Sequence, residues 1–257
     1  MSYIECVELW KSKSLTEKKE MLIRFGWKFT YGSNKIENSN THLKDVEDIF
    51  NSRIIDTKSD ITKKTENEIR NHKSVLKEIT KDFLTDTLEE ITIDKIKDLH
   101  LKLMIGCYDK TRISKGERPG EFKKGDYVVG LHDVGASPED VVTELESLLD
   151  EIYEVDVTPM NSIKIVSYFH CWFESIHPFA DGNGRLGRLL LNYILLANDL
   201  PPIILFDRDR NQYYLALEEF TESQEIQKMV DFLEMEAEKT WLKDYNTKVK
   251  RLNVFLD

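Results

Sequence analysis

The sequence predicts an all-α fold, and three observations support this prediction. The chain of 257 residues contains only 6 prolines and 11 glycines, which are the residues that most often interrupt helices. Apolar residues recur every three or four positions through most of the chain. The pattern fails only at the glycine-rich residues 112–137, where a short alternating run around Tyr127 allows at most a small β-hairpin. We therefore expect a helical bundle with one irregular loop.

Helices are expected on both sides of this loop. Before it, they are expected at residues 5–31 (as one helix or two), 33–37, 43–50, 62–82 and 92–105. After it, they are expected from Ser137-Pro138 through 152, and at 160–176, 185–198, 210–220 and 224–240. Thr16, Ser33 and Thr92 are the predicted N-caps. The two most apolar helices, 160–176 and 185–198, should form the centre of the core.

Composition narrows the classes of function. Hydrophobic residues make up 40% and charged residues 32%, which is an ordinary balance for a soluble protein. The net charge of -11 disfavours binding to nucleic acid or to an anionic membrane, because both need a basic surface. The three cysteines form no CxxC pair, and the N-terminus lacks a signal peptide. We therefore expect a cytoplasmic protein without nucleic-acid or membrane partners.

The segment HPFADGNGRLGR, residues 177–188, lies between the two most apolar helices and carries groups suited to phosphate chemistry. His177 has the side chain whose ordinary pKa suits proton transfer near neutrality. Asp181 is a hard oxygen ligand of the kind that holds Mg²⁺ together with substrate phosphates. The consecutive residues Gly182, Asn183 and Gly184 allow several backbone N–H groups to converge on one anion.

Two arginines follow at the start of the next helix. Arg185 and Arg188 are three residues apart, so they lie on neighbouring faces of its first turn. Positive charge at a helix N-terminus is unfavourable unless an anion binds there. Paired guanidinium groups at this place can hold a polyphosphate. Together with the base and the acid, they predict a site for phosphoryl transfer.

Each of these features has a simpler structural interpretation when taken alone. A histidine before proline is often structural, and Asp-Gly-Asn-Gly is often only a turn. Residues 182–187 also match G-x-G-x-x-G, but no β-strand precedes them, so a Rossmann interpretation is excluded. The combination within 12 residues is what favours a functional site.

At this loop the sequence resembles the Fic (filamentation induced by cAMP) family, whose motif His-Pro-Phe-x-Asp/Glu-Gly-Asn-Gly-Arg-x-x-Arg is matched at every specified position. The resemblance implies a Fic-type helical bundle with a small β-hairpin flap over the active site. It implies that His177 deprotonates a target hydroxyl, and that Asp181 holds Mg²⁺ (or Mn²⁺) on ATP. The anion hole would consist of Gly182, Asn183 and Gly184. Arg185 and Arg188 would bind the β- and γ-phosphates.

A second stretch, SNKIEN at residues 33–38, resembles the inhibitory motif of the same family, Ser/Thr-x-x-x-Glu-Gly/Asn. Taken alone it is a common helix start. The resemblance implies that Ser33, Glu37 and Asn38 belong to an N-terminal inhibitory helix at about residues 33–40. Glu37 would pair with Arg188 through two hydrogen bonds and thereby occupy the arginine that the γ-phosphate needs.

Two further regions resemble the family more loosely. Residues 118–136 stand where the family places its flap, a hairpin that pairs with the backbone of the target. The candidate flap residues are Phe122, Lys123, Tyr127 and Val128. Tyr214 and Leu217 are the candidates for the adenine pocket, although Tyr213 and Tyr214 are also suited to the core.

The resemblance implies a protein adenylyltransferase (AMPylator) that transfers AMP from Mg-ATP to a Ser, Thr or Tyr hydroxyl of a target protein, or of itself. It also implies autoinhibition through Glu37, and is compatible with a homodimer. Residues 1–90 would form an N-terminal helical region, 91–236 the Fic core, and 237–257 an amphipathic tail. The alternatives are a de-AMPylating hydrolase, in which Glu37 positions water, use of a nucleotide other than ATP, and a non-catalytic nucleotide-binding module.

Overall fold

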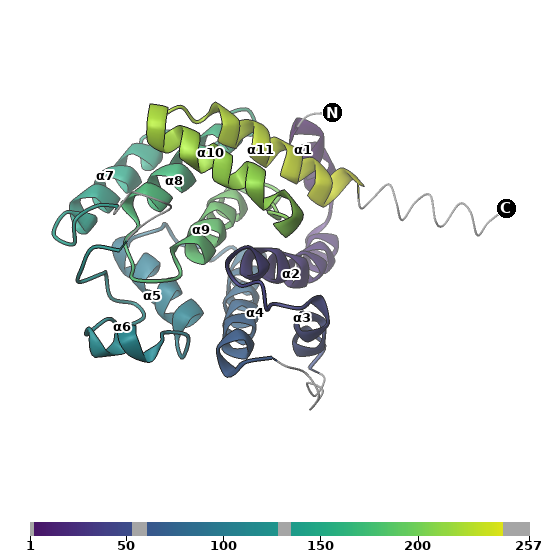
Figure 1. Cartoon of the computed structure of the whole chain (residues 1–257). Helices are drawn as coiled ribbons and strands as arrows, with labels where there is room; N and C mark the ends of the chain where they lie inside the picture. The colour runs from purple at the N-terminus through teal and green to yellow at the C-terminus, as the bar shows by residue number, and fades with distance from the viewer. Residues whose placement is uncertain (1–2, 53–60, 128–134, 244–257) are drawn as a thin grey trace.

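The protein is a bundle of α-helices in a computed structural model, in which residues 3–52, 61–127 and 135–243 are described (Figure 1). The helices are α1 (Tyr3–Lys11), α2 (Leu15–Glu37), α3 (Leu43–Phe50), α4 (Lys63–Leu84), α5 (Ile93–Met104), α6 (Lys110–Ser114), α7 (Val141–Tyr153), α8 (Ser162–Ile176), α9 (Asn183–Ala197), α10 (Arg210–Ser223) and α11 (Gln227–Glu238). A 3₁₀ turn at Asp207–Asp209 and a π-helical turn at Lys239–Lys243 complete them.

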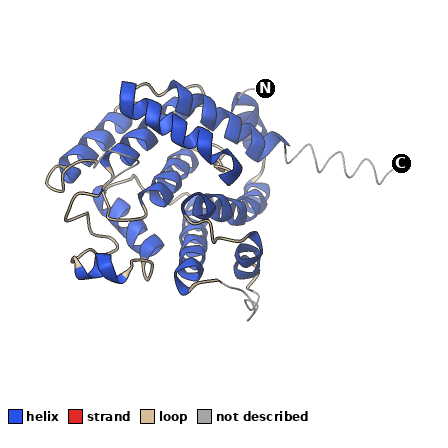
Figure 2. Cartoon of the chain, viewed as in Figure 1, coloured by secondary structure: helices blue, strands red, loops and turns tan. Residues whose placement is uncertain are grey.

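The described residues contain helices, turns and loops but no strand (Figure 2). The predicted all-α fold is therefore confirmed. The predicted hairpin is not seen in the described part of its loop, where residues 118–127 are turns, bends and irregular chain. Val128 lies outside the described residues, together with the rest of 128–134.

The centre of the molecule is the antiparallel pair of α8 and α9 (Figure 1). Every residue of α9 from Leu189 to Leu196 is buried, because this helix is covered on all sides. Helices α7, α10 and α11 pack against α8, while α2, α4 and α5 pack against α9. Each leucine buried here contributes about 1.5–3 kcal/mol. The rigid centre of the fold thus carries the predicted catalytic loop at one end.

Helix α2 is a single helix of 23 residues, and this corrects two expectations. Its N-cap is Ser14 rather than Thr16, because Ser14 and Glu17 form a reciprocal capping box. The separate short helix predicted from Ser33 does not exist, since residues 33–37 are the last turn of α2. Gly32 does not end the helix: a Cβ there would lie 2.6 Å from the Leu205 carbonyl oxygen, so the glycine permits close packing.

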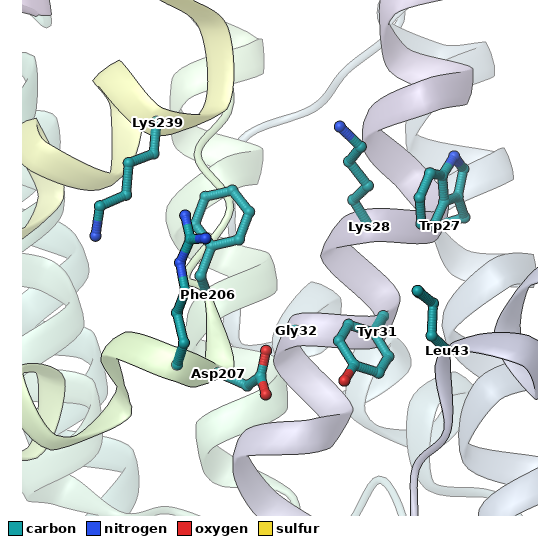
Figure 3. A pocket seen from close by; sticks show the side chains of 9 residues that line it. Trp27, Lys28, Tyr31, Gly32, Leu43, Phe206, Asp207 and Lys239 are labelled. Atoms are coloured by element: carbon teal, nitrogen blue, oxygen red, sulfur yellow. The ribbon is translucent and has the colours of Figure 1, made fainter. Parts of the chain in front are cut away.

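The outer face of α2 borders a pocket of about 260 Å³. The pocket is lined by α2 from Trp27 to Gly32, the start of α3, the segment from Phe206 to Arg208, and Lys239 (Figure 3). Helix α2 therefore separates this pocket from α4 and α9, against which its other faces pack.

Other boundaries match the sequence pattern with small differences. Thr92 caps α5 as predicted, and Thr62 caps α4. Helix α7 begins at Val141 rather than directly after Ser137, because residues 138–140 form a turn. Among the described residues, no helix combines the length and apolar character needed to cross a membrane. At the predicted tail, Trp241 is buried against Trp10, and residues 244–257 lie outside the described residues.

Candidate active site

His177 stands at the point where α8 ends. The residue before a proline is disfavoured in the helical region, so the chain leaves the helix before Pro178. His177 takes a left-handed conformation with φ 51°, and its backbone N–H donates to the Phe173 carbonyl at 3.1 Å. The conformation turns the chain sharply out of α8. The imidazole is thereby placed at the entrance of the loop rather than on the helix.

Burial and charge keep the imidazole of His177 neutral. Desolvation, together with the charge of the nearby Lys123 ammonium, lowers its pKa to about 4. Near pH 7 the side chain is therefore unprotonated and able to accept a proton. The Lys123 side chain is itself buried, and its backbone N–H donates to the Pro178 carbonyl at 2.9 Å.

The turn after His177 is held by its own residues. The Asn183 side chain accepts from the Phe179 N–H at 2.9 Å and donates to the Phe179 carbonyl at 2.7 Å. Phe179 is fully buried, and its ring stacks on His100 at a centroid distance of 3.6 Å. His100 accepts from the Gly120 N–H at 2.8 Å, so its other ring nitrogen donates to the Asp181 carbonyl at 2.9 Å. This turn is thus fixed before any ligand binds.

Gly182 and Gly184 are required by geometry. Gly182 is the N-cap of α9 with φ 89°, and a Cβ there would lie 2.6 Å from Met104 Sδ. A Cβ on Gly184 would lie 2.4 Å from Glu37 Oε1. The close approach brings the last turn of α2 directly onto the predicted anion hole.

Both arginines of the loop are buried and paired with acids from the N-terminal helices. Arg188 is 0% exposed, and its Nη2 donates to Glu37 Oε1 at 2.9 Å. Nε and Nη2 also donate to the Ser33 hydroxyl and carbonyl at 3.1 and 3.0 Å. The predicted two-bond contact with Glu37 is therefore wrong in detail, because Ser33 takes the second position. Burial is the largest single effect on Arg188 and opposes its charge, but Glu37, Tyr213 and Glu174 together outweigh burial and raise the pKa.

Arg185 has a partner that the sequence analysis did not include. Its Nη1 donates to Glu68 Oε1 of α4 at 2.7 Å, and its Nη2 donates to Asp181 Oδ1 at 3.1 Å. Its side chain is only 6% exposed and that of Glu68 only 3%. Glu68 was missed because a single acid on an amphipathic helix carries no signal of its function.

Asp181 lies within a group of cations. Besides Arg185, Lys64 Nζ lies 3.7 Å and Arg112 Nη1 3.9 Å from Asp181 Oδ2. Neither Lys64 nor Arg112 was predicted, because both come from helices far from the loop in sequence. The described residues hold no cluster of three or more His, Cys, Asp or Glu side chains suited to a metal ion. A lone carboxylate fits Mg²⁺ that is held mainly by phosphate oxygens, and the surrounding cations fit the phosphates themselves.

The candidates for the adenine pocket divide between core and surface. Tyr213 is buried, and its hydroxyl contacts both Arg188 at 3.4 Å and His170 at 3.0 Å. Tyr214 is 45% exposed, and burial together with the Glu37 charge raises its pKa. Leu217 is partly buried one turn further along α10. Tyr214 and Leu217 thus remain candidates, whereas Tyr213 belongs to the core.

Of the candidate flap residues, Phe122 and Lys123 contact the catalytic loop, and the described residues of the flap segment form no hairpin. Phe122 lies 5.2 Å from Phe179 between ring centroids, and Lys123 is buried as described above. Tyr127 donates to Glu117 Oε1 at 2.8 Å. These contacts hold residues 122–127, the described first part of the segment.

A helical bundle that presents a glycine-rich turn and two buried arginines at one helix N-terminus defines a class of protein suited to polyphosphate ligands. Residues 90–195 match the model of the Fic/DOC family. The match includes the whole loop of residues 177–188, so this part of the chain is assigned to the family.

Named relatives and solved structures agree with this assignment. The chain is 29% identical over 187 residues to protein adenylyltransferase Fic of Nematostella vectensis, covering 72% of this chain and 40% of that protein. It is 27% identical over 202 residues to protein adenylyltransferase fic-1 of Caenorhabditis elegans, covering 79% and 38%. The chain therefore spans less than half the length of these relatives. A Fic domain containing signaling protein from Bacteroides thetaiotaomicron has the same fold, with TM-score 0.79, 21% identity and coverage of 93% of both chains.

Proposed function

We propose that this protein is an adenylyltransferase that transfers AMP from Mg-ATP to a Ser, Thr or Tyr hydroxyl of a protein. The observation that carries the proposal is a neutral histidine at the entrance of a fixed, glycine-rich turn that leads into two buried arginines. The relatives described above are named protein adenylyltransferases, which supports the same activity.

In the proposed reaction, His177 accepts the proton of the target hydroxyl. The hydroxyl oxygen forms a bond to the α-phosphorus, the bond between the α- and β-phosphates breaks, and pyrophosphate leaves. Backbone N–H groups of Gly182 to Gly184 would stabilise the charge on the phosphate oxygens, and Arg185 and Arg188 would hold the leaving group. Asp181 would hold Mg²⁺ (or Mn²⁺), which neutralises phosphate charge when bound.

We further propose that Glu37 inhibits the reaction in the resting state. Its pairing with Arg188 occupies a guanidinium group that the γ-phosphate needs, and its Oε1 lies close to Gly184. In the domain division proposed from the sequence, the inhibitory Glu37 belongs to the N-terminal region of residues 1–90, and the Fic core comprises residues 91–236. This proposal has three further parts: a homodimer, adenine contacts made by Tyr214 and Leu217, and a flap formed around Phe122, Lys123, Tyr127 and Val128.

The decisive experiment is mass spectrometry of wild-type protein and Glu37→Gly after incubation with Mg-ATP. We expect an added AMP mass on Glu37→Gly and much less on the wild type. The double variant Glu37→Gly/His177→Ala is the control and should stay unlabelled. An unlabelled Glu37→Gly protein that also fails to label candidate targets would contradict the proposed activity.

A second candidate, the removal of AMP from a protein, is favoured by one observation. About a third of the Glu37 side chain, 34%, is exposed at the site, so its carboxylate can also position a water molecule. In that case Glu37→Gly should abolish the release of AMP from a modified protein, which can be measured on the same samples.

A further inference from the structure

The two arginines of the loop are held in the same way by two different helices. Arg188 contacts Glu37 at the end of α2, and Arg185 contacts Glu68 in the second turn of α4. In both pairs the arginine is almost completely buried. Only the first of these acids belongs to the inhibitory motif.

Two nitrogens of the Arg185 guanidinium group are directed at acids, whereas its Nε has no hydrogen-bond partner among the described residues. Nη1 donates to Glu68, and Nη2 donates to Asp181. A polyphosphate that binds Arg185 must therefore compete with Glu68 for the same guanidinium group. Because the pair is buried, removing the negative charge of Glu68 leaves the arginine without full compensation and favours an incoming anion.

Asn38 connects the two contacts. It follows Glu37 as the C-cap of α2, and its Nδ2 donates to Glu68 Oε2 at 2.9 Å and to Thr65 Oγ1 at 3.1 Å. One oxygen of Glu68 thus holds Arg185 while the other is held by the residue next to Glu37. Movement of the end of α2 would disturb both arginine contacts together.

We propose that Glu68 is a second inhibitory carboxylate, which withholds Arg185 from nucleotide phosphate, and that Asn38 couples it to Glu37. This inference rests on the proposed function. Inhibition then has two parts, one for each arginine. Full activity requires that phosphate replaces both Glu37 and Glu68 as the partner of its arginine. The alternative is that Glu68 only positions Arg185, and it predicts the opposite effect of a substitution.

The test is the affinity of a non-hydrolysable ATP analogue with Mg²⁺, measured by calorimetry on the full chain. In the Glu37→Gly background, Glu68→Gln should tighten binding about tenfold, because the arginine loses its competing charge. Glu66→Gln is the matched control: it lies on the same helix, contacts Lys63 and Arg70 near the surface, and should leave the affinity unchanged. Unchanged or weaker binding by Glu37→Gly/Glu68→Gln would overturn the inference.

Asn38→Ala gives a second measurement at a partly exposed position, in case Glu68→Gln lowers stability. It should tighten binding of the analogue about two- to threefold in wild-type protein, in the same direction as Glu68→Gln but less. No change, or weaker binding, would contradict the coupling.

The two proposals fail in distinguishable ways. If Glu37→Gly binds the analogue and transfers AMP but neither Glu68→Gln nor Asn38→Ala tightens binding, only the second inhibitory contact is wrong. If Glu37→Gly neither binds the analogue nor transfers AMP, the proposed function is wrong and this inference falls with it.

Discussion

The catalytic loop and the regulatory end of α2 are both largely buried, but they are held by different kinds of contact. In the loop, Asn183 satisfies both backbone groups of Phe179, and His100 connects the turn to Gly120. In α2 and α4, several buried side-chain atoms lack a hydrogen-bond partner among the described residues, including the amide atoms of Asn34 and both ring nitrogens of His72; the loop has two such atoms, His177 Nδ1 and Arg185 Nε, outside its paired turn. Unpaired buried polar groups weaken an interface. The difference suggests a fixed catalytic turn beside a helix end that can be displaced.

The largest expected effect is in the fixed region. In the Glu37→Gly background, His177→Ala should lower AMP transfer about 10²–10⁴-fold, because the general base is removed. The affinity for the ATP analogue should change little, because the proposed phosphate-binding residues Arg185 and Arg188 form their ion pairs with Glu68 and Glu37 and not with His177. Labelling with α-labelled ATP measures the first quantity and calorimetry the second. Equal labelling by both proteins would show that another group is the base.

A matched pair of substitutions tests the comparison directly. Asn183 and Asn34 are each 1% exposed, but of these two side chains only that of Asn183 has hydrogen-bond partners among the described residues. Asn183→Ala should lower the free energy of unfolding by about 2–3 kcal/mol, because two buried backbone groups lose their partners. Asn34→Ala should change it by less than about 1 kcal/mol. Urea unfolding measures both, and similar losses would contradict the proposed difference between the regions.

Four buried histidines allow a prediction of how the free energy of unfolding depends on pH. Burial lowers the pKa of His72, His100 and His170 to about 3, and that of His177 to about 4. The unfolded chain takes up these protons below about pH 6.5, whereas the folded protein does not. Stability should therefore be constant with respect to these groups above pH 6.5 and fall as the pH falls towards 4. Each histidine contributes about 1.4 kcal/mol per pH unit in that range. Urea midpoints at pH 7, 6 and 5 measure the slope.

The smallest expected effect comes from His72→Leu. At pH 7 it should stabilise the protein by at most about 1 kcal/mol, because it removes two unpaired buried polar atoms. The substitution should also reduce the change in the free energy of unfolding between pH 6 and 5 by the contribution of one histidine, about 1.4 kcal/mol per pH unit. An unchanged slope would mean that His72 is not held neutral in the folded protein.

The sequence singled out the loop of residues 177–188 as the candidate site because its groups are consecutive in the chain. Helices with strong apolar patterns, such as α8 and α9, were also placed to within two residues. The sequence analysis missed Lys64, Glu68 and Arg112, because helix packing brings them to the loop from distant segments. It also divided α2 at Gly32, since a glycine used for close packing against Leu205 looks the same in sequence as one that ends a helix.

Gly184 has a consequence for which sequences this fold can tolerate. The Glu37 carboxylate lies where any side chain at position 184 would begin, so that position and the acid share one volume. A descendant that acquires a larger residue there must move the acid aside, and thus alters its regulation and its phosphate site in one mutational step. Changes in regulation and in phosphate binding are therefore coupled through Glu37 and Gly184, although these residues lie in opposite halves of the chain.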